Sequence, residues 1–382
     1  MEKRPLKPML TRLLSYVLVA AVASFVTWCT ASLVPDSKLE RLADVIDRKF
    51  IAESNETQLQ DAAAEAMIQA LGDRWSYYIS AEEYADHLDR QSNEYVGIGV
   101  TVMAREDKTG YDIVEVNPDG PAKEAGVLAG DIVTHADGNF LGECTVSEVR
   151  GFIMGKKNTQ VVLTVLRGNE KLEISVPRKV IHSKIVVSRM LEGNIGYIQI
   201  DNFHSGAGKE TIEAVKALLD QGAEKLIFDV RGNPGGYVHE MVEVLDYLLP
   251  EGPLFRSVDY NGREDLDESD ADCLEMPMAV LINGGTYSAA EFFAAALREY
   301  DWAVTVGEPT TGKGYYQTTI ELGDGSAVQL STGAYTTPKG VNLTEVGGLK
   351  PDVPAAPADT VVATEEDPQI LAAMGALETQ NK

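Results

Sequence analysis

The chain has 382 residues, which at about 150 residues per domain predicts two to three domains and a sizeable core. Its 59 acidic side chains outnumber the 33 basic ones, and a formal net charge of −26 argues against a nucleic-acid partner. The three cysteines lie far apart and form no C-x-x-C motif, which excludes a disulfide framework and a zinc ribbon.

The N-terminal segment has the composition of a membrane signal. Basic residues precede residues 13–34, a stretch without a charged side chain. At about 1.5 Å per residue, a helix of this length crosses the roughly 30 Å hydrocarbon layer, and the basic flank places the N-terminus in the cytoplasm. We therefore expect residues 1–35 to be a cytoplasmic tail and a transmembrane anchor. A cleaved signal peptide is the alternative, because such peptides share the basic start.

After this segment the pattern of apolar residues changes three times. Residues 36–91 repeat apolar side chains at helical spacing. Residues 92–178 form short strand patterns separated by turns, with two short helices between them. In residues 179–355 strands alternate with helices, which predicts an α/β unit around a largely buried sheet. We expect one more helix in residues 356–382, and a solvated loop or lid in the acidic run 263–275.

The most distinctive candidate for chemistry is Ser288. It follows a predicted strand and a Gly-Gly turn and opens a predicted helix, in the stretch NGGTYSAAEFF. A nucleophile there gains from the positive potential and the free N–H groups at a helix N-terminus. The alternative is structural, since Ser288 and Glu291 also have the spacing of a capping box. A G-x-S-x-G elbow is absent from the sequence.

A second candidate stretch, GKGYYQ, contains Lys313 and Gln317. From Gly307 to Lys313 the sequence nearly fits a phosphate-binding loop, but Gly314 stands where Ser or Thr is required, which argues against ATP. If the stretch enters a strand, Lys313 and Gln317 project from the same face. A lysine buried there loses its charge easily and can act as a general base. The alternative is a surface lysine in a Gly-rich turn.

Two Gly-rich turns can present backbone N–H groups. RGNPGG, residues 231–236, joins a predicted strand to a helix, and its donors suit an oxyanion or a peptide. A plain β-to-α turn is the equal alternative. The other turn lies in YVGIGVTV, where a loop before a strand can bind a terminal carboxylate while the strand pairs with the incoming peptide.

The five histidines offer no better catalytic base. Neither His204 nor His239, which border the predicted core strands, matches a triad signature. His239 begins H-E-x-x-E instead of H-E-x-x-H, which excludes that zinc-protease design.

Taken together, these stretches resemble the C-terminal processing proteases, the tail-specific S41-type serine endopeptidases that contain a PDZ domain. The resemblance covers roughly residues 40–355 and depends on motifs that follow the family's order: GDRWSYYISAEEY, VGIGV, GPAKEAGVLAGDIV, VRGNPGG, NGGTYSAAE, GKGYYQ and GLKPDV. Together with the membrane helix expected from the N-terminal segment, it implies a multidomain α/β protein with a helical segment, a PDZ-like β domain at 92–178 and a crotonase/ClpP-like α/β protease core at 179–355.

The resemblance also implies roles for individual residues. Ser288 would be the nucleophile, Lys313 its base and Gln317 the residue that orients the lysine. The remaining implied residues are the oxyanion donors, Gly235 or Gly236 together with Ala289, and the carboxylate-binding loop of the PDZ domain, Gly97, Ile98, Gly99 and Val100. Departures from the family are Tyr287, where a small residue is usual, and the pair Tyr315–Tyr316. Both differences concern the width of the cleft, and therefore the substrate preference more than the chemistry.

These observations lead to a membrane-anchored, extracytoplasmic serine endopeptidase that acts through an acyl-enzyme and needs no metal or nucleotide cofactor. Its partners would be protein or peptide substrates with free C-terminal tails, and its PDZ domain would act as a gate. Helices at the two ends of the chain are candidates for a homodimer contact. The rival functions are a catalytically silent, membrane-tethered PDZ scaffold and a crotonase-type acyl-CoA enzyme.

Overall fold

The computed structural model describes residues 16–24, 37–357 and 366–380. Residues 16–24 are helical, whereas the rest of the expected membrane segment 13–34 lies outside the described residues. In the part of the chain that is described, no helix is both long enough and apolar enough to cross a bilayer. The chain divides into two compact units, residues 1–78 and 79–382.

The first unit is helical downstream of residue 36, as the apolar spacing predicts. Its helices are α2 (Lys38–Lys49) and α3 (Glu56–Gln69). Ser37 and Glu40 form a capping box at the start of α2, which satisfies backbone N–H groups that a helix leaves free. Neither helix contains a buried residue, and α2 exposes a row of apolar side chains: Leu39, Leu42 and Val45.

The second unit begins with β1 (Tyr77–Ile79) at its boundary and α4 (Ala81–Gln91), followed by a β domain. The sheet of this domain has the order β3-β4-β5-β7-β8, with β6 paired to β5, so β3 lies at one edge. A separate antiparallel pair joins β2 (Glu94–Gly97) to β9 (Lys179–His182). The elements of the sheet and its two helices are β3 (Val100–Ala104), β4 (Tyr111–Val116), α5 (Pro121–Glu124), β5 (Ile132–Ala136), β6 (Asn139–Phe140), α6 (Val146–Ile153), β7 (Gln160–Arg167) and β8 (Glu170–Pro177).

The α/β unit predicted from residues 179–355 is confirmed. Its sheet has the order β10-β11-β12-β15-β16-β19, in which only β10 is antiparallel to its neighbour. The elements are β10 (Val186–Leu191), β11 (Ile195–Ile200), α7 (Ala207–Asp220), β12 (Lys225–Asp229), α8 (Val238–Leu248), β15 (Met278–Ile282), α9 (Ala289–Glu299), β16 (Ala303–Gly307), β19 (Val353–Pro354) and α10 (Pro368–Thr379).

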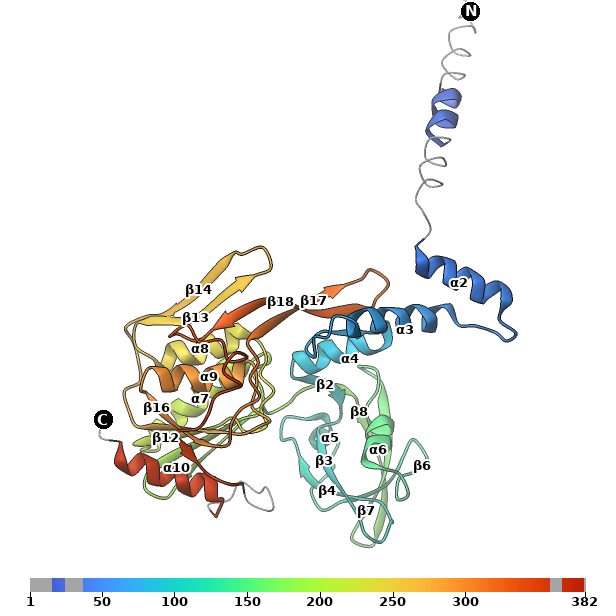
Figure 1. The fold of residues 1–382 in the computed structure, drawn as a ribbon. Coiled ribbons are helices and arrows are strands. Elements are labelled where there is room, and N and C mark those ends of the chain that lie inside the picture. Colours follow the sequence, from blue (N-terminus) through green and yellow to red (C-terminus); the bar gives the residue numbers. More distant parts are fainter. Residues whose placement is uncertain (1–15, 25–36, 358–365, 381–382) are drawn as a thin grey trace, which may run out of the picture. The chain divides into compact units, whose positions relative to one another are not determined.

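Helices cover both faces of this sheet (Figure 1). On β12, Leu226 and Phe228 pack into the apolar cluster that also contains residues of α7, α8 and α9. Ile227, between them, packs into the cluster formed with α10. This alternation follows from the period of two in a strand, and it explains why the strands are apolar on both faces. The helix expected in the C-terminal segment is confirmed as α10.

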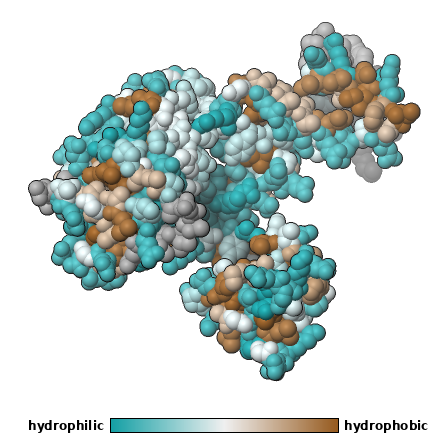
Figure 2. Space-filling model, turned by 60° about the horizontal axis from the view of Figure 1, so that its bottom comes forward, coloured by the Kyte–Doolittle hydropathy of each residue, from teal (hydrophilic) through white to brown (hydrophobic). Residues whose placement is uncertain are grey.

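A second, antiparallel sheet contains β13 (Gly252–Asp259), β14 (Glu264–Ser269), β17 (Tyr315–Glu321) and β18 (Ala327–Thr336). The acidic run 263–275 was expected to be a loop, and this is wrong for residues 264–269, which form β14. They pair with β13 at the end of the sheet, where one side of a strand stays solvated and tolerates charge. The visible surface is mostly hydrophilic, with apolar residues in separate patches (Figure 2).

Candidate active site

Ser288 occupies a strained position at the junction of β15 and α9. Its backbone has φ 59° and ψ −129°, a conformation that residues other than glycine rarely adopt. It is the N-cap residue of α9, but its side chain makes no capping hydrogen bond. The capping-box alternative for Ser288 and Glu291 is therefore wrong. Strain of this kind costs about 1–3 kcal/mol and is concentrated at functional sites.

Glu291 has a different role from the capping one. Its side chain is fully buried, and its carboxylate accepts hydrogen bonds from the backbone N–H of Gly312 (2.7 Å), the backbone N–H of Lys313 (2.9 Å) and the hydroxyl of Thr310. Burial raises the pKa of Glu291, although these hydrogen bonds oppose the shift. The carboxylate thus ties the loop that carries Lys313 to the first turn of the Ser288 helix.

Lys313 is buried near Tyr287, the residue that precedes Ser288. Only 7% of the residue is exposed, and its Nζ lies 5.9 Å from the centroid of the Tyr287 ring. The same loop is fixed at Thr311, whose N–H donates to the carbonyl of Thr286 over 3.2 Å. The alternative of a surface lysine in a Gly-rich turn is therefore wrong.

Tyr335, which the sequence did not single out, contacts both candidate residues. It lies on β18 and is 4% exposed. Its hydroxyl donates to the backbone carbonyl of Lys313 and is also hydrogen-bonded to the side chain of Ser288. Burial raises the pKa of Tyr335, so the phenol stays neutral. No local motif marks this residue, because its contacts come from distant parts of the chain.

Of the expected oxyanion donors, Gly235 and Ala289 lie against each other at Ser288, and Gly236 follows Gly235 in the chain. A Cβ atom on Gly235 would lie 2.7 Å from the Ser288 Cβ and 2.8 Å from the Ala289 nitrogen, so only glycine permits this approach. The N–H of Gly235 donates to the side-chain oxygen of Asn233 over 2.8 Å. Within the described residues, the N–H groups of Gly236 and Ala289 donate no hydrogen bond. Of the two glycines, Gly236 is therefore the one whose N–H is not already used by Asn233.

Gln317 lies on β17, the strand that follows Lys313, and its side chain donates hydrogen bonds to Tyr315 and Ser331. The strand β17 begins only at Tyr315, and a bulge follows between Tyr316 and Gln317, so the predicted alternation does not extend to Lys313. The Gln317 amide donates to the carbonyl of Tyr315 (3.1 Å) and to the hydroxyl of Ser331 (3.0 Å). Its orienting role stays a prediction.

The loop expected to bind a carboxylate lies between β2 and β3. Ile98 is 1% exposed and belongs to the apolar core of the β domain, so its side chain is structural. The carbonyls of Ile98 and Gly99 accept hydrogen bonds from the N–H groups of Ala122 (2.9 Å) and Asn117 (2.9 Å). Gly99 has φ 76°, and Val100 begins the edge strand β3. This geometry leaves the backbone of the loop and of β3 as the elements that can contact a peptide.

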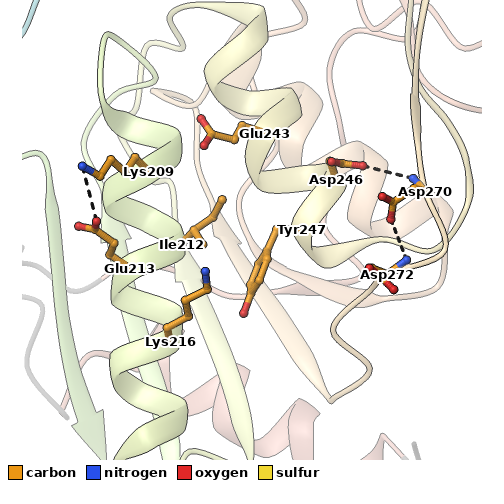
Figure 3. A pocket seen from close by; sticks show the side chains of 9 residues that line it. All are labelled: Lys209, Ile212, Glu213, Lys216, Glu243, Asp246, Tyr247, Asp270 and Asp272. Carbon is orange, nitrogen blue, oxygen red and sulfur yellow. Dashed lines mark hydrogen bonds and ion pairs between the residues drawn. The ribbon is translucent and has the colours of Figure 1, made fainter.

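A pocket of about 410 Å³ lies elsewhere on the core, between α7 and α8 (Figure 3). Lys216 projects toward Tyr247 there, with its Nζ 5.3 Å from the ring centroid. Carboxylates from α7, α8 and the 270–272 loop also line the pocket. None of the predicted site residues lines this pocket. In the residues that the structure describes, no group of three His, Cys, Asp or Glu side chains could hold a metal ion.

Two family models match the chain. Residues 96–177 match the PDZ domain, and residues 194–355 match peptidase family S41.

Two curated relatives extend the match over most of the chain. The carboxy-terminal processing protease CtpA of Bacillus subtilis (strain 168) is 33% identical over 367 residues, which covers 92% of this chain and 78% of that protein. A protein of Staphylococcus aureus (strain MRSA252), named as a CtpA-like serine protease, is 30% identical and covers 83% of this chain. The chain spans 64% of the length of this staphylococcal relative.

The chain also aligns with solved structures, one of which shows the same fold with a TM-score above 0.5. An S41 protease from Bacteroides fragilis aligns with a TM-score of 0.52 at 17% identity, over 84% of this chain and 90% of that one. The photosystem II D1 C-terminal processing protease is 25% identical and aligns with a TM-score of 0.48, over 83% of this chain and 86% of that one.

Proposed function

The chain belongs to the carboxy-terminal processing proteases of peptidase family S41, which are serine-type endopeptidases, and on this basis we propose that Ser288 and Lys313 form its catalytic dyad. One observation carries the proposal. Lys313 is buried next to the strained turn that contains Tyr287 and Ser288. Its loop is held in place by Glu291, which lies in α9, the helix that Ser288 begins. Burial favours the uncharged form of an amine, which is the form that can accept a proton.

The chemistry follows from these positions. The neutral Nζ of Lys313 accepts the Ser288 proton while Oγ attacks the carbonyl carbon of the scissile peptide bond. The N–H groups of Gly236 and Ala289 donate to the resulting oxyanion. Collapse of this intermediate breaks the C–N bond, and the Lys313 ammonium gives its proton to the leaving amine. Water, deprotonated by Lys313, then attacks the acyl-enzyme ester. The ester C–O bond breaks, the Lys313 ammonium returns its proton to the Ser288 Oγ, and the new C-terminal carboxylate leaves.

We assign substrate capture to the β domain. Its match to the PDZ family and the position of β3 at a sheet edge support the binding of a peptide as an additional strand. The N–H groups around Gly97, Ile98, Gly99 and Val100 would receive the terminal carboxylate. The substrate is then a protein with a free, apolar C-terminal tail. Because the PDZ domain would act as the gate, tail binding would activate the protease as well as deliver the substrate.

We also propose an extracytoplasmic location, with residues 13–34 as the membrane anchor. The support comes from the sequence: the uncharged stretch and its basic flank. A homodimer contact is proposed for the N-terminal helices, because Leu39, Leu42 and Val45 of α2 are exposed. Fractionation of expressing cells tests the membrane location, and analytical ultracentrifugation of the protein tests the homodimer.

Cleavage of a model protein with an apolar C-terminal tail tests the function. Wild-type protein, Ser288→Ala and Lys313→Ala are compared, and binding of the tail peptide is measured in parallel. We expect both variants to lose cleavage while peptide binding persists. Undiminished cleavage by either variant contradicts the dyad. Equal cleavage of substrates with free and amidated tails contradicts recognition of the carboxylate.

A further inference from the structure

The C-terminal helix α10 packs on the face of the core sheet opposite α7, α8 and α9 (Figure 1). Ile370, Ala373 and Leu377 are buried in one apolar cluster with residues of β11, β12, β15 and β16. The matched S41 region ends at residue 355, so α10 lies outside it. The helix is therefore an addition to the part of the chain that carries Ser288 and Lys313.

The first turn of α10 binds an arginine from another part of the chain, Arg231, whose side chain is 11% exposed. Asp367 is 2% exposed, and its Oδ1 caps the helix by accepting the N–H of Gln369 over 2.8 Å. Its other oxygen, Oδ2, accepts a hydrogen bond from the guanidinium of Arg231 over 2.8 Å. Gln369 adds a second acceptor, with its Oε1 2.7 Å from the same Arg231 nitrogen, while its Nε2 donates to the carbonyl of Ala355. One helix start thus supplies two acceptors to Arg231.

Arg231 is fixed on its other side by the end of β12. Its Nε and Nη2 donate to the carboxylate of Asp229, the last residue of the strand, at 2.9 and 2.6 Å. Asp229 also accepts the hydroxyl of Tyr197 over 2.6 Å. The next residue, Gly232, donates its N–H to the side chain of Asn283 over 2.9 Å. Arg231 therefore connects α10 to the turn that ends at Gly236.

This turn and the Ser288 turn are joined directly. The N–H of Tyr287 donates to the carbonyl of Asn233 over 3.2 Å, and Asn283 accepts from both Gly232 and Gly285. A shift of Arg231 would move the Gly236 donor relative to Ser288. The apolar cluster alone accounts for the attachment of α10, and a buried ion pair is weak evidence for stability, so positioning is the better explanation of these charges.

We propose that α10 is a positioning element for the oxyanion site, in which Asp367 and Gln369 hold Arg231 and, through it, the 231–236 turn. The inference depends on the proposed function of Gly236 as an oxyanion donor. Asp367 and Arg231 are positioning residues, since neither touches the substrate.

The test compares Asp367→Asn with Leu377→Ala in the full chain. Leu377 is buried in the same helix, about 15 Å further along its axis, and has no link to Arg231. We expect Leu377→Ala to lower the Tm with kcat unchanged well below it. Asp367→Asn should lower kcat at least about tenfold, with KM changed less than about threefold. Asp367→Asn should add little to Arg231→Gln, because both remove the same contact.

Hydrogen exchange separates failure of this inference from failure of the proposed function. In a Ser288→Ala background, which needs no activity, Asp367→Asn should speed amide exchange in residues 231–236, and Leu377→Ala should not. An unchanged kcat and unchanged exchange in Asp367→Asn would overturn the positioning role. So would a loss of kcat in Leu377→Ala equal to that in Asp367→Asn. A wild-type protein without Ser288-dependent cleavage, but with the expected exchange pattern, would instead remove the proposed function.

Discussion

The carboxylate of Glu291 accepts a hydrogen bond from the backbone N–H of Lys313 over 2.9 Å, in a fully buried setting. Because Glu291 lies one turn after Ser288 on the same helix, this contact fixes the lysine loop relative to the nucleophile. The relative position of the two candidate residues therefore depends on a third residue, Glu291, which contributes only as a hydrogen-bond acceptor.

Replacing Glu291 should reduce turnover more than stability alone explains. Glu291→Ala leaves the donors of Thr310, Gly312 and Lys313 without their acceptor, at about 1–3 kcal/mol for each buried group. The loop would relax, and a displacement near 1 Å lowers kcat by roughly 100-fold. Glu299→Ala is the matched control, since Glu299 of the same helix holds the loop at Lys339 instead. Steady-state kinetics and thermal unfolding check this, and equal kcat for the two variants would contradict it.

Substitutions of Ser288 should separate strain from chemistry. Both Ser288→Gly and Ser288→Ala remove the nucleophile, but only glycine adopts φ 59° without a Cβ penalty. We expect Ser288→Gly to unfold at a higher urea concentration than Ser288→Ala, with a free energy of unfolding that is greater by about 1 kcal/mol or more. A Ser288→Ala protein as stable as Ser288→Gly would show that the turn is not strained.

Crowding at Gly99 should control tail binding. A Cβ on Gly99 would lie 3.2 Å from both the Asn117 Cβ and the Ile181 Cδ1, at φ 76°. Gly99→Ala should shift the loop and weaken binding of an apolar tail peptide by about tenfold, or 1.4 kcal/mol. Gly130→Ala is the control, because its φ is 89° and nothing lies within 4 Å of its Cβ. Fluorescence anisotropy measures both, and equal loss in the two variants would attribute the effect to backbone strain alone.

The stability of the β domain should vary with pH because of Asp131. Burial acts to raise the pKa of Asp131, but hydrogen bonds from Arg167 and from the N–H of Leu128 outweigh it and lower the pKa below the ordinary value of 3.8. Because its pKa is lower in the folded state, ionised Asp131 contributes its full stabilisation at pH values above the unfolded-state pKa of 3.8. This stabilisation is lost as the pH falls through the lower folded-state pKa. Asp131→Asn should therefore lower the Tm at pH 7, with a difference from wild type that shrinks below pH 4. A constant difference would contradict this.

Much of the candidate site could be proposed from sequence, because Ser288, Lys313 and the Gly-rich turns are local motifs. The true partner of Glu291 could not be predicted, since a residue three positions after an N-cap has the same spacing whether it forms a capping box or holds another loop. Tyr335 and Asp367 could not be found this way. Asp367 meets Arg231 across 136 residues, and only the folded sheet brings them together. The acidic strand β14 was missed because its charges fit a solvated sheet edge as well as a loop.

Covalent labelling of Ser288 tests the central claim most directly. An alkyl fluorophosphonate reacts with an activated serine, and peptide mass spectrometry locates the adduct. Wild-type protein should be modified at Ser288, and Lys313→Met should react slower by about 10²- to 10⁴-fold, the usual contribution of a general base. Equally fast labelling of folded Lys313→Met, or an adduct on another residue, would contradict the Ser288–Lys313 dyad.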